Sequence, residues 1–361
     1  MLKTLLDNFT PESNPIIWLS FAFVLAFIIA YQTFPTILFV AEQKHLMDEP
    51  DNRSVHSNRT PTLGGIGIFV SIVFVMTITG AMLNTKVLLL VMGGLTILFF
   101  LGLKDDLTVL SARKKFTGQL IAALLLIVLT DTRIIGFSKI LDVDVLPYWV
   151  SIFFTLFVYI LIINAYNLID GVDGLAGSIA LLISAIFSVI FYVSGALSLA
   201  TISVALIGAL LAFLRFNFSS KKKIFMGDTG SMIVGFLLAF FTISFISQSQ
   251  TNIESSYYRA SPALALALLF YPLLDTFRIF FIRIFILKKS PFEADKNHIH
   301  HRFIQAGFSH IQTTLIIMLI GLIIIIIAFN MLHLNLNSQI GLLLVYGTIL
   351  YYLPFLIKRQ F

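Results

Sequence analysis

The chain has 361 residues, of which 58% are hydrophobic and only 12% are charged, whereas soluble domains carry about 25% charged residues. With a mean hydropathy of +0.97, this composition excludes an ordinary soluble protein and is typical of a membrane protein. The absence of cysteine excludes disulfides, thiolate metal ligands and a cysteine nucleophile, and the net charge of +6 is concentrated in a few loops. Any metal must therefore be held by oxygen or imidazole ligands, with hard cations as the default.

Apolar stretches repeat almost from end to end and leave no room for an independent soluble domain. A bilayer core needs about 20 apolar residues per helix, so we expect one all-α, polytopic membrane domain over residues 1–361 with about eleven spans. The first stretch lacks a small-residue cleavage site, which favours an uncleaved span over a signal peptide. The predicted spans are residues 16–40, 64–83, 87–103, 117–130, 147–166, 175–193, 197–216, 231–247, 261–287, 312–332 and 339–356.

The basic residues are distributed unevenly between the two sides of these spans. Nineteen of the 24 Lys and Arg fall on one side, and the positive-inside rule makes that side cytoplasmic. The N-terminus is then periplasmic and the C-terminus cytoplasmic. The opposite loops are short, except residues 131–147, where the alternation in LDVDVLP predicts a small exposed hairpin.

The first predicted cytoplasmic loop, residues 41–63, ends in TPTLGG at the start of the second span. Backbone amides at a glycine-rich helix start can bind an anion, although such a loop can also be a mere connector. The next loop, residues 104–116, opens with Asp105 and Asp106. Adjacent carboxylates repel each other, so a site that keeps both ionised usually supplies a metal ion or a lysine. The alternative is a solvated helix end.

The stretch NAYNLIDGVDGLAG, within residues 164–177, carries four polar residues in steps of three: Asn164, Asn167, Asp170 and Asp173. On a helix such residues share one face, whereas the glycines between them permit tight packing or a break. Polar groups at this depth are costly unless they are satisfied by water, metal or each other. The stretch therefore predicts a functional site more strongly than a helix cap.

The loop at residues 215–231 pairs a lysine run with Gly227 and Asp228. Asp228 either takes part in a site or caps the following helix. The lysines either contribute to the site or are topology charges and contacts to anionic lipid.

The loop at residues 288–311 contains HIHHR, in which His298, His300 and His301 lie beside Arg302. This cluster can bind phosphate, bind metal or move protons; without cysteines or acids at finger spacing, structural zinc is not expected. We expect His45, His310 and His333 to be ordinary surface or interfacial residues. We expect Asp275 and Arg278 to form an ion pair that packs one helix against another.

Five segments thus present acids, amides, glycines and bases at one predicted cytoplasmic face. Carboxylates with a metal, surrounded by Lys and Arg, are typical of phosphoryl transfer, in which the protein positions the reactants and neutralises phosphate charge. Mg²⁺ or Mn²⁺ is the expected cofactor.

These motifs, in the order SVHSNRTPTLGG, KDDL, NAYNLIDGVDGLAG, FMGDTGS and HIHHR, resemble those of the polyprenyl-phosphate N-acetylhexosamine-1-phosphate transferases of glycosyltransferase family 4. The resemblance covers about residues 45 to 302. It implies eleven helices with an outside N-terminus. It also implies attack by a lipid phosphate on the β-phosphorus of a UDP-N-acetylsugar, with release of UMP.

The resemblance also implies roles for individual residues. The resemblance implies that Asp228 is the metal ligand and that Asp105 and Asp106 activate the lipid phosphate or help to hold the metal, with their division of labour open. The remaining implied site residues are Asn167, Asp170 and Asp173 near the diphosphate, Asn217 and Phe225 at the uridine, Lys115 or the adjacent Lys114 at the lipid phosphate, and Gly227, His298, His300, His301 and Arg302 in the binding and catalytic loops. One extra residue separates Asn217 from Phe225 here.

The HIHHR form resembles the branch that uses UDP-N-acetylglucosamine or similar sugars, as distinct from the branch that loads muramyl pentapeptide. The implied partners are a UDP-N-acetylhexosamine, undecaprenyl phosphate and membrane lipids, with no nucleic acid; a homodimer stays open. The implied location is the bacterial inner membrane, at the start of lipid-linked cell-envelope glycan synthesis such as that of O-antigen.

Two other classes of protein compete with the enzyme. An ion-coupled transporter would also place acids within a membrane domain, but its site would lie at the bilayer midplane, and the two halves of the sequence show no internal repeat. If the protein were a lipid-binding scaffold, the acids of KDD, NLIDGVD and GD would have no function.

Overall fold

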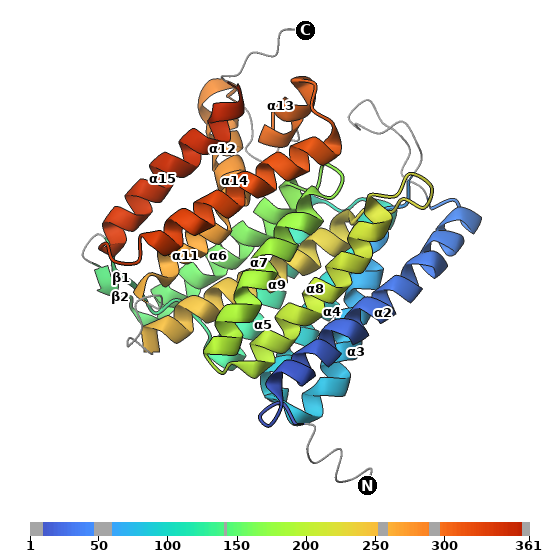
Figure 1. Cartoon of the computed structure of the whole chain (residues 1–361), viewed down its shortest axis with the longest axis horizontal. Helices are drawn as coiled ribbons and strands as arrows, with labels where there is room; N and C mark the ends of the chain where they lie inside the picture. The colour runs from blue at the N-terminus through green and yellow to red at the C-terminus, as the bar shows by residue number, and fades with distance from the viewer. Residues whose placement is uncertain (1–9, 47–59, 141–142, 252–258, 289–296, 356–361) are drawn as a thin grey trace. The chain divides into compact units, whose positions relative to one another are not determined.

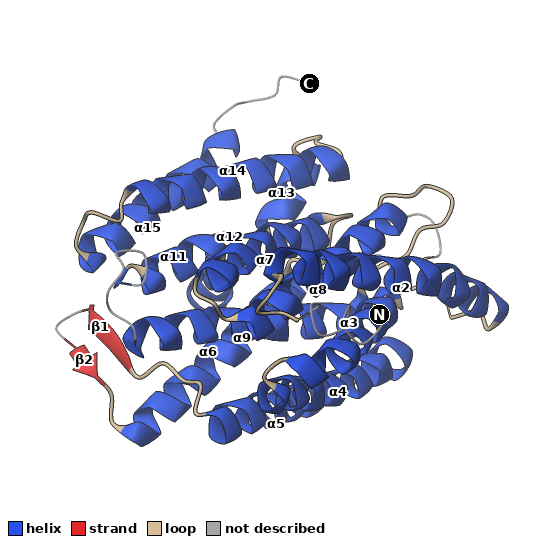
Figure 2. Cartoon of the chain, turned by 60° about the horizontal axis from the view of Figure 1, so that its bottom comes forward, coloured by secondary structure: helices blue, strands red, loops and turns tan. Residues whose placement is uncertain are grey.

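The computed structural model describes residues 10–46, 60–140, 143–251, 259–288 and 297–355. Within these residues the chain is almost entirely helical, with one two-stranded hairpin (Figure 2), which confirms the all-α expectation. The described chain divides into two compact units. Unit 1 comprises Met1–Asp131 and Gly177–Leu238, and unit 2 comprises Thr132–Ala176 and Ala239–Phe361.

Unit 1 is a bundle in which α2 packs against α8 and α3 (Figure 1). Small residues allow this close approach: Ala22, Ala26 and Ala205 are completely buried together, and a Cβ on Gly208 would lie 2.4 Å from the carbonyl oxygen of Phe23. The elements of unit 1 are α2 (Pro15–Gln43), α3 (Gly64–Thr79), η1 (Gly80–Met82), α4 (Thr85–Thr108), α5 (Ala112–Thr130), most of α7 (Leu175–Val193), α8 (Leu197–Asn217) and the first half of α9 (Gly227–Thr251).

Unit 2 contains a sharply bent helix pair, α11 and α12, whose axes differ by 74°. Pro272 explains the break, because its ring lacks an N–H and clashes with the carbonyl four residues earlier, at Leu268, where α11 ends. The elements of unit 2 are β1 (Gly136–Ile140), β2 (Val143–Val145), α6 (Tyr148–Leu168), α11 (Ser261–Leu268), α12 (Phe270–Phe281), the π-helical turn η2 (Ile282–Ile286), α13 (Ile299–Gln305), α14 (His310–Asn330), α15 (Leu336–Tyr352), η3 (Leu353–Phe355) and the second half of α9.

The predicted hairpin exists as the antiparallel pair β1 and β2. Its base is fixed by Gln250 near the end of α9. The Gln250 side chain accepts a hydrogen bond from the amide of Ile135 and donates one to the carbonyl oxygen of Gly136, both at 2.7 Å. The alternation of apolar and polar residues in the sequence therefore predicted this element correctly.

All eleven predicted spans are helical. In the described chain, eight helices are long and apolar enough to cross a bilayer, and the bent pair α11 and α12 makes nine. The other two are α5 and α15. Three basic residues at the start of α5 and the 17-residue length of α15 leave each with a shorter apolar stretch than a bilayer core needs. The protein is thus a multi-pass membrane protein.

Candidate active site

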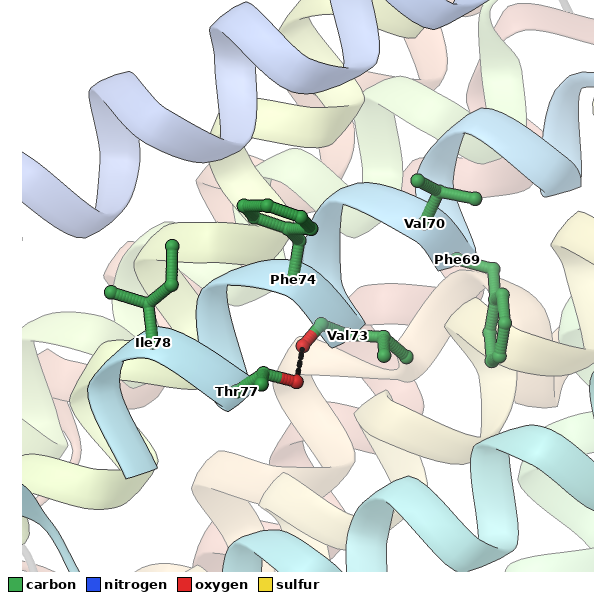
Figure 3. Close-up of a pocket in the computed structure, with 6 residues that line it drawn as sticks. All are labelled: Phe69, Val70, Val73, Phe74, Thr77 and Ile78. Atoms are coloured by element: carbon green, nitrogen blue, oxygen red, sulfur yellow. Dashed lines mark hydrogen bonds between the residues drawn. The ribbon is translucent and has the colours of Figure 1, made fainter. Parts of the chain in front are cut away.

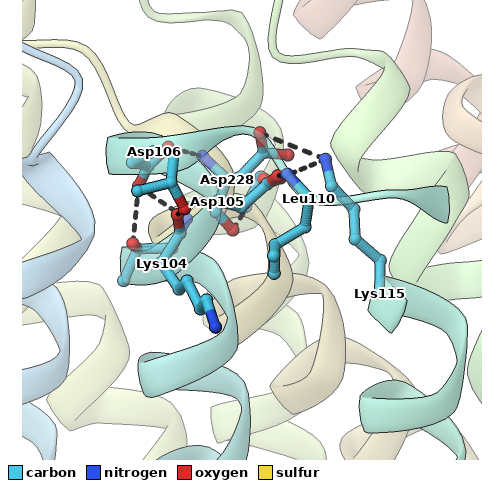
Figure 4. Close-up of polar contacts among 9 residues, drawn as sticks. Lys104, Asp105, Asp106, Leu110, Lys115 and Asp228 are labelled. Carbon is cyan, nitrogen blue, oxygen red and sulfur yellow. Dashed lines mark hydrogen bonds and ion pairs between the residues drawn. The ribbon is translucent and has the colours of Figure 1, made fainter. Parts of the chain in front are cut away.

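Four charged residues of unit 1, which we call the carboxylate cluster, come together at the ends of three helices (Figure 4). Asp105 and Asp106 lie in the last turn of α4, Lys115 in the first turn of α5 and Asp228 in the first turn of α9. The sequence motifs KDD and GD, which are more than 120 residues apart, are therefore adjacent in the folded chain.

Asp106 caps α9 from another helix. One of its oxygens accepts a hydrogen bond from the amide of Asp228 at 2.7 Å, and the other accepts bonds from the amide and the hydroxyl of Thr229 at 3.0 and 2.5 Å. Amides in the first turn of a helix have no partner within the helix, and the helix dipole favours a negative charge there. Asp106 of α4 thus caps the start of α9; the helix-cap alternative for the Asp228 side chain stays a prediction.

Asp105 and Asp228 share one cation, the ammonium group of Lys115. Lys115 forms an ion pair with the buried Asp105 and a second one with Asp228, with 3.4 Å between Nζ and Oδ2. Asp105 also accepts a hydrogen bond from the amide of Leu110. Of the two lysines that the sequence left open, Lys115 is the one in the cluster, whereas Lys114 is exposed.

Lys115 lies in the charged first turn of α5, before its apolar stretch. Burial lowers the pKa of Lys115, but the carboxylates of Asp228 and Asp105 outweigh burial and hold the pKa above its ordinary value. Lys115 is therefore a permanent cation at physiological pH, and it is the counter-charge of Asp105, one of the two adjacent acids for which the sequence predicted a metal ion or a lysine.

Two glycines make this arrangement possible. Gly227 has φ +71°, and a Cβ there would lie 2.0 Å from the carbonyl oxygen of Thr62 and 2.9 Å from both oxygens of Asp106. A Cβ on Gly65 would lie 2.2 Å from the amide nitrogen of Gly230. Any larger side chain would push the start of α9 away from its neighbours.

The TPTLGG segment supports the start of α9 by backbone pairing. The amide of Gly64 donates to the carbonyl oxygen of Phe225 and the amide of Gly65 to that of Met226, both at 2.9 Å. The prediction that these amides bind an anion is therefore wrong for Gly64 and Gly65, because they are already satisfied by backbone. The residues before this segment, SVHSNR at 54–59, lie outside the described residues.

The predicted uridine contacts lie in the loop before α9. Asn217 is buried, and its amide group donates to the carbonyl oxygen of Ile224 at 2.8 Å. The amide of Phe225 donates to Pro61 at 2.9 Å, and the ammonium of Lys223 lies 5.3 Å from the Phe225 ring centre. Asn217 thus shapes the loop; contact of either residue with uridine stays a prediction.

In unit 2, the NLIDGVDG segment breaks the helix. α6 ends at Leu168 and α7 begins at Leu175, so the expectation of one shared helical face is wrong for Asp170 and Asp173, which lie in the intervening turns. Gly174, with φ +73°, permits the break. The sequence allowed either tight helix packing or a helix break at these glycines, and the structure has the break.

Asp173 is paired with a histidine that sequence reasoning set aside. Nδ1 of His310 lies 3.1 Å from Oδ2 of Asp173, and the Thr314 hydroxyl donates to the carbonyl oxygen of Asp173 at 2.9 Å. Both partners are at the start of α14. His310, which we expected to be an ordinary surface or interfacial residue, is partly buried and paired with one of the predicted site residues. Because the two residues are 137 positions apart, no spacing rule would have linked them.

The histidine segment, residues 297–302, begins α13 and contacts the NLIDGVDG segment directly. A Cβ on Gly171 would lie 2.9 Å from Nε2 of His300, and Nδ1 of His300 is 3.1 Å from the Tyr271 hydroxyl. The pKa of His300 is lowered to about 3, mainly by burial; Asp275 opposes this shift and the neighbouring histidines add to it. His300 is therefore neutral at physiological pH. The preceding residues 289–296 lie outside the described residues.

Asp275 of α12 has further partners besides the predicted Arg278. Its carboxylate accepts hydrogen bonds from Nδ1 of His298 at 2.7 Å and from the amide of Ile299 at 2.9 Å. Arg278 is 3.9 Å away on the same helix. The predicted Asp275–Arg278 ion pair is therefore present, and both residues also bind the histidine segment at the start of α13.

An apolar pocket lies on α3, lined by Phe69, Val70, Val73, Phe74, Thr77 and Ile78 (Figure 3). Its one hydroxyl, on Thr77, donates to the backbone carbonyl of Val73 at 2.8 Å. Apart from this hydroxyl oxygen, the side chains that line the pocket are apolar, so the pocket suits an apolar chain.

Among the residues that the structure describes, no three His, Asp or Glu side chains form a metal-binding group. A hard cation fits the carboxylate cluster nevertheless. Asp228 is partly exposed, and Lys115 already marks a position where one cation is shared by two carboxylates. Mg²⁺ is commonly bound by one or two carboxylates, with substrate phosphates and water completing its shell.

The sequence profile of the family described as Glycosyl transferase family 4 matches residues 88–246, which include the whole carboxylate cluster. A protein of Bacillus subtilis (strain 168), named "probable undecaprenyl-phosphate N-acetylglucosaminyl 1-phosphate transferase", is 34% identical over 306 residues, or 83% of this chain and 82% of that protein. The chain belongs to glycosyl transferase family 4. The predicted resemblance is thereby confirmed.

Other members of glycosyl transferase family 4 are similar over most of their length. The decaprenyl-phosphate N-acetylglucosaminephosphotransferase of Mycobacterium tuberculosis (strain ATCC 25618 / H37Rv) is 33% identical over 81% of this chain and 78% of its own length. The undecaprenyl-phosphate alpha-N-acetylglucosaminyl 1-phosphate transferase of Escherichia coli (strain K12) is 31% identical over 78% and 75%. These names are all of transferases, and none supports the transporter alternative.

Proposed function

We propose that this chain transfers N-acetylglucosamine 1-phosphate from its UDP derivative to undecaprenyl phosphate, with release of UMP. The observation that carries the proposal is the carboxylate cluster, in which Asp105 and Asp228 share the cation Lys115 within a family 4 transferase. The names of the relatives supply the sugar phosphate and the lipid. The resemblance of the sequence motifs to the family supports a UDP-N-acetylhexosamine as the donor.

The residues of the cluster suit phosphoryl transfer. Lys115 is placed to neutralise the charge of an incoming phosphate, and Asp105 and Asp106 hold Lys115 and the start of α9 in position. We propose that Asp228 holds Mg²⁺, or Mn²⁺ in its place. When bound, such an ion neutralises diphosphate charge and stabilises the departure of UMP.

We place the site on the cytoplasmic face of the bacterial inner membrane, as the initiating step of a lipid-linked cell-envelope glycan. The uneven distribution of Lys and Arg supports this orientation, and the bacterial relatives support the membrane.

UMP release by the purified full-length protein tests the function. With Mg²⁺ and UDP-N-acetylglucosamine, we expect UMP only when a polyprenyl phosphate is present, and loss of nearly all turnover in Asp228→Asn. The matched control is Asp144→Asn, which changes an exposed aspartate in β2 and should retain wild-type turnover.

Two further experiments test which metal and which sugar donor the protein uses. Chelation with EDTA should abolish UMP release, and excess Mg²⁺ or Mn²⁺ should restore it. A panel of UDP-N-acetylhexosamines and UDP-muramyl pentapeptide should show preference for UDP-N-acetylglucosamine. Absence of UMP with every donor, or full activity of Asp228→Asn, would refute the proposed function.

A further inference from the structure

One face of α12 carries three polar side chains in a helix whose only other polar side chain is that of Thr276. Tyr271, Asp275 and Arg278 occupy positions i, i+4 and i+7, which lie on one side of a helix. All three contact the histidine segment: Tyr271 contacts His300, Asp275 contacts His298 and Ile299, and Arg278 donates to the carbonyl oxygen of Asn297 at 2.5 Å. We call these three side chains the polar face of α12.

Asp275 is the centre of this face and is completely buried. A buried carboxylate is costly unless hydrogen bonds compensate the loss of water, and both of its oxygens are engaged, one by the Ile299 amide and one by His298 Nδ1. The bond to Ile299 is sufficient to fix the start of α13. The second bond, to the imidazole, does nothing for the backbone and instead fixes the ring.

The ring of His298 is held on its other side as well. It stacks on the His300 ring, with centroids 5.3 Å apart and an angle of 9° between the planes, and His300 is bonded to Tyr271. A carboxylate acceptor at Nδ1 requires a proton on that nitrogen, which determines the tautomer of a neutral histidine and leaves Nε2 for other partners.

We propose that Asp275 is a positioning residue for the transfer reaction: it keeps the proton of His298 on Nδ1, so that Nε2 carries the lone pair and accepts a hydrogen bond from a protonated phosphate oxygen of the reactants. The identity of that phosphate rests on the proposed function. The placement of the ring and of its proton rests on the contacts of α12 alone.

The variant Asp275→Asn separates the hydrogen bond to the Ile299 amide from the hydrogen bond to the His298 ring. The asparagine oxygen can still accept from the Ile299 amide, but its NH₂ group would face Nδ1 of His298 and force the proton to Nε2. We expect kcat for UMP release to fall roughly 100-fold, with little change in KM for UDP-N-acetylglucosamine and in melting temperature, because the ring is kept but its proton is misplaced. The control is Thr276→Val on the same helix, since the Thr276 hydroxyl bonds only to the Pro272 carbonyl; it should retain wild-type kcat.

Coupling between the two residues distinguishes positioning from general support of the fold. Asp275→Asn combined with His298→Gln should lose no more kcat than the worse single variant, because Asp275 acts through His298. Losses that multiply in the double variant would overturn the proposal, as would near wild-type kcat in Asp275→Asn.

A spectroscopic readout tests the tautomer without turnover. In protein labelled with ¹⁵N at histidine, with the His298 signals assigned through His298→Gln, we expect a protonated Nδ1 in the wild type and an unprotonated Nδ1 in Asp275→Asn. An unprotonated Nδ1 in the wild type, or identical spectra, would overturn the inference. If the wild-type protein released no UMP, the proposed function would fail, whereas this spectrum would still decide how Asp275 and His298 are paired.

Discussion

Two neighbouring carboxylates, Asp105 and Asp106, bind different groups in the fold. Asp105 pairs with Lys115, while Asp106 accepts hydrogen bonds from the amides of Asp228 and Thr229. Sequence alone could not separate them, because adjacent residues on a helix point about 100° apart and only the fold determines what each one meets. The sequence did predict that both belong to the site and that a counter-charge is needed.

This division of labour predicts different losses in two variants. Asp106→Asn leaves one helix-start amide facing an NH₂ group, so we expect the unfolding free energy to fall by about 1–2 kcal/mol. Asp105→Asn should lower turnover more than stability, because its partner Lys115 remains partly solvated. Melting temperature in detergent and UMP release, measured on both variants, check this; the reverse ranking of the two melting temperatures would contradict it.

The low pKa of His300 predicts a pH-dependent stability. Its pKa is about 3 in the folded protein and about 6.5 in an unfolded chain, so the unfolded state binds the extra proton as pH falls below 6.5, and stability falls between pH 6.5 and 3. From pH 7.5 to 5.5 this one group contributes a loss of about 1.4 kcal/mol.

The matching measurement is the difference in melting temperature between pH 7.5 and pH 5.5. We expect this difference to be smaller in His300→Gln than in the wild type. His333→Gln changes an exposed histidine in the turn after α14 and should keep the wild-type difference. Equal differences in wild type and His300→Gln would show that His300 does not contribute.

At the scale of elements, sequence periodicity and length predicted where helices occur but not where they break. The apolar stretches gave the eleven helical spans and the hairpin because both signals are local. The turns between α6 and α7, by contrast, depend on packing of Gly171 against His300, and the bend at Pro272 became interpretable only once Leu268 was known to end α11. Contacts between distant segments, such as Asp173 with His310, carry no local signal.

The close packing of α2 on α8 predicts a large effect for one methyl group. A Cβ on Gly208 would meet the backbone oxygen of Phe23 at 2.4 Å, so Gly208→Ala must push the helices apart, at about 1–3 kcal/mol. Gly341→Ala is the matched control: it lies in α15 with no atom within 4 Å and should be neutral or slightly stabilising, as alanine favours helix. A melting temperature of Gly208→Ala equal to that of the wild type would contradict this packing.

At the scale of the whole molecule, the distribution of charge predicts the orientation in the membrane. The absence of cysteine allows single cysteines to be introduced without background. A membrane-impermeant maleimide added to intact cells should label Asn84→Cys and His333→Cys, in predicted external loops, but label Lys114→Cys and Lys221→Cys only after the membrane is opened. Labelling of the two lysine positions in intact cells would show that the topology is the reverse of the predicted one.

The hairpin of β1 and β2 also gives the protein a rigid landmark for structure determination. A 40.4 kDa chain whose mass is mostly apolar helix is largely hidden by detergent or lipid, which leaves few features with which to align single-particle images. The hairpin is exposed at β2 and fixed at its base by two hydrogen bonds to Gln250. An antibody fragment raised against it would therefore be held firmly by the hairpin and would enlarge the particle.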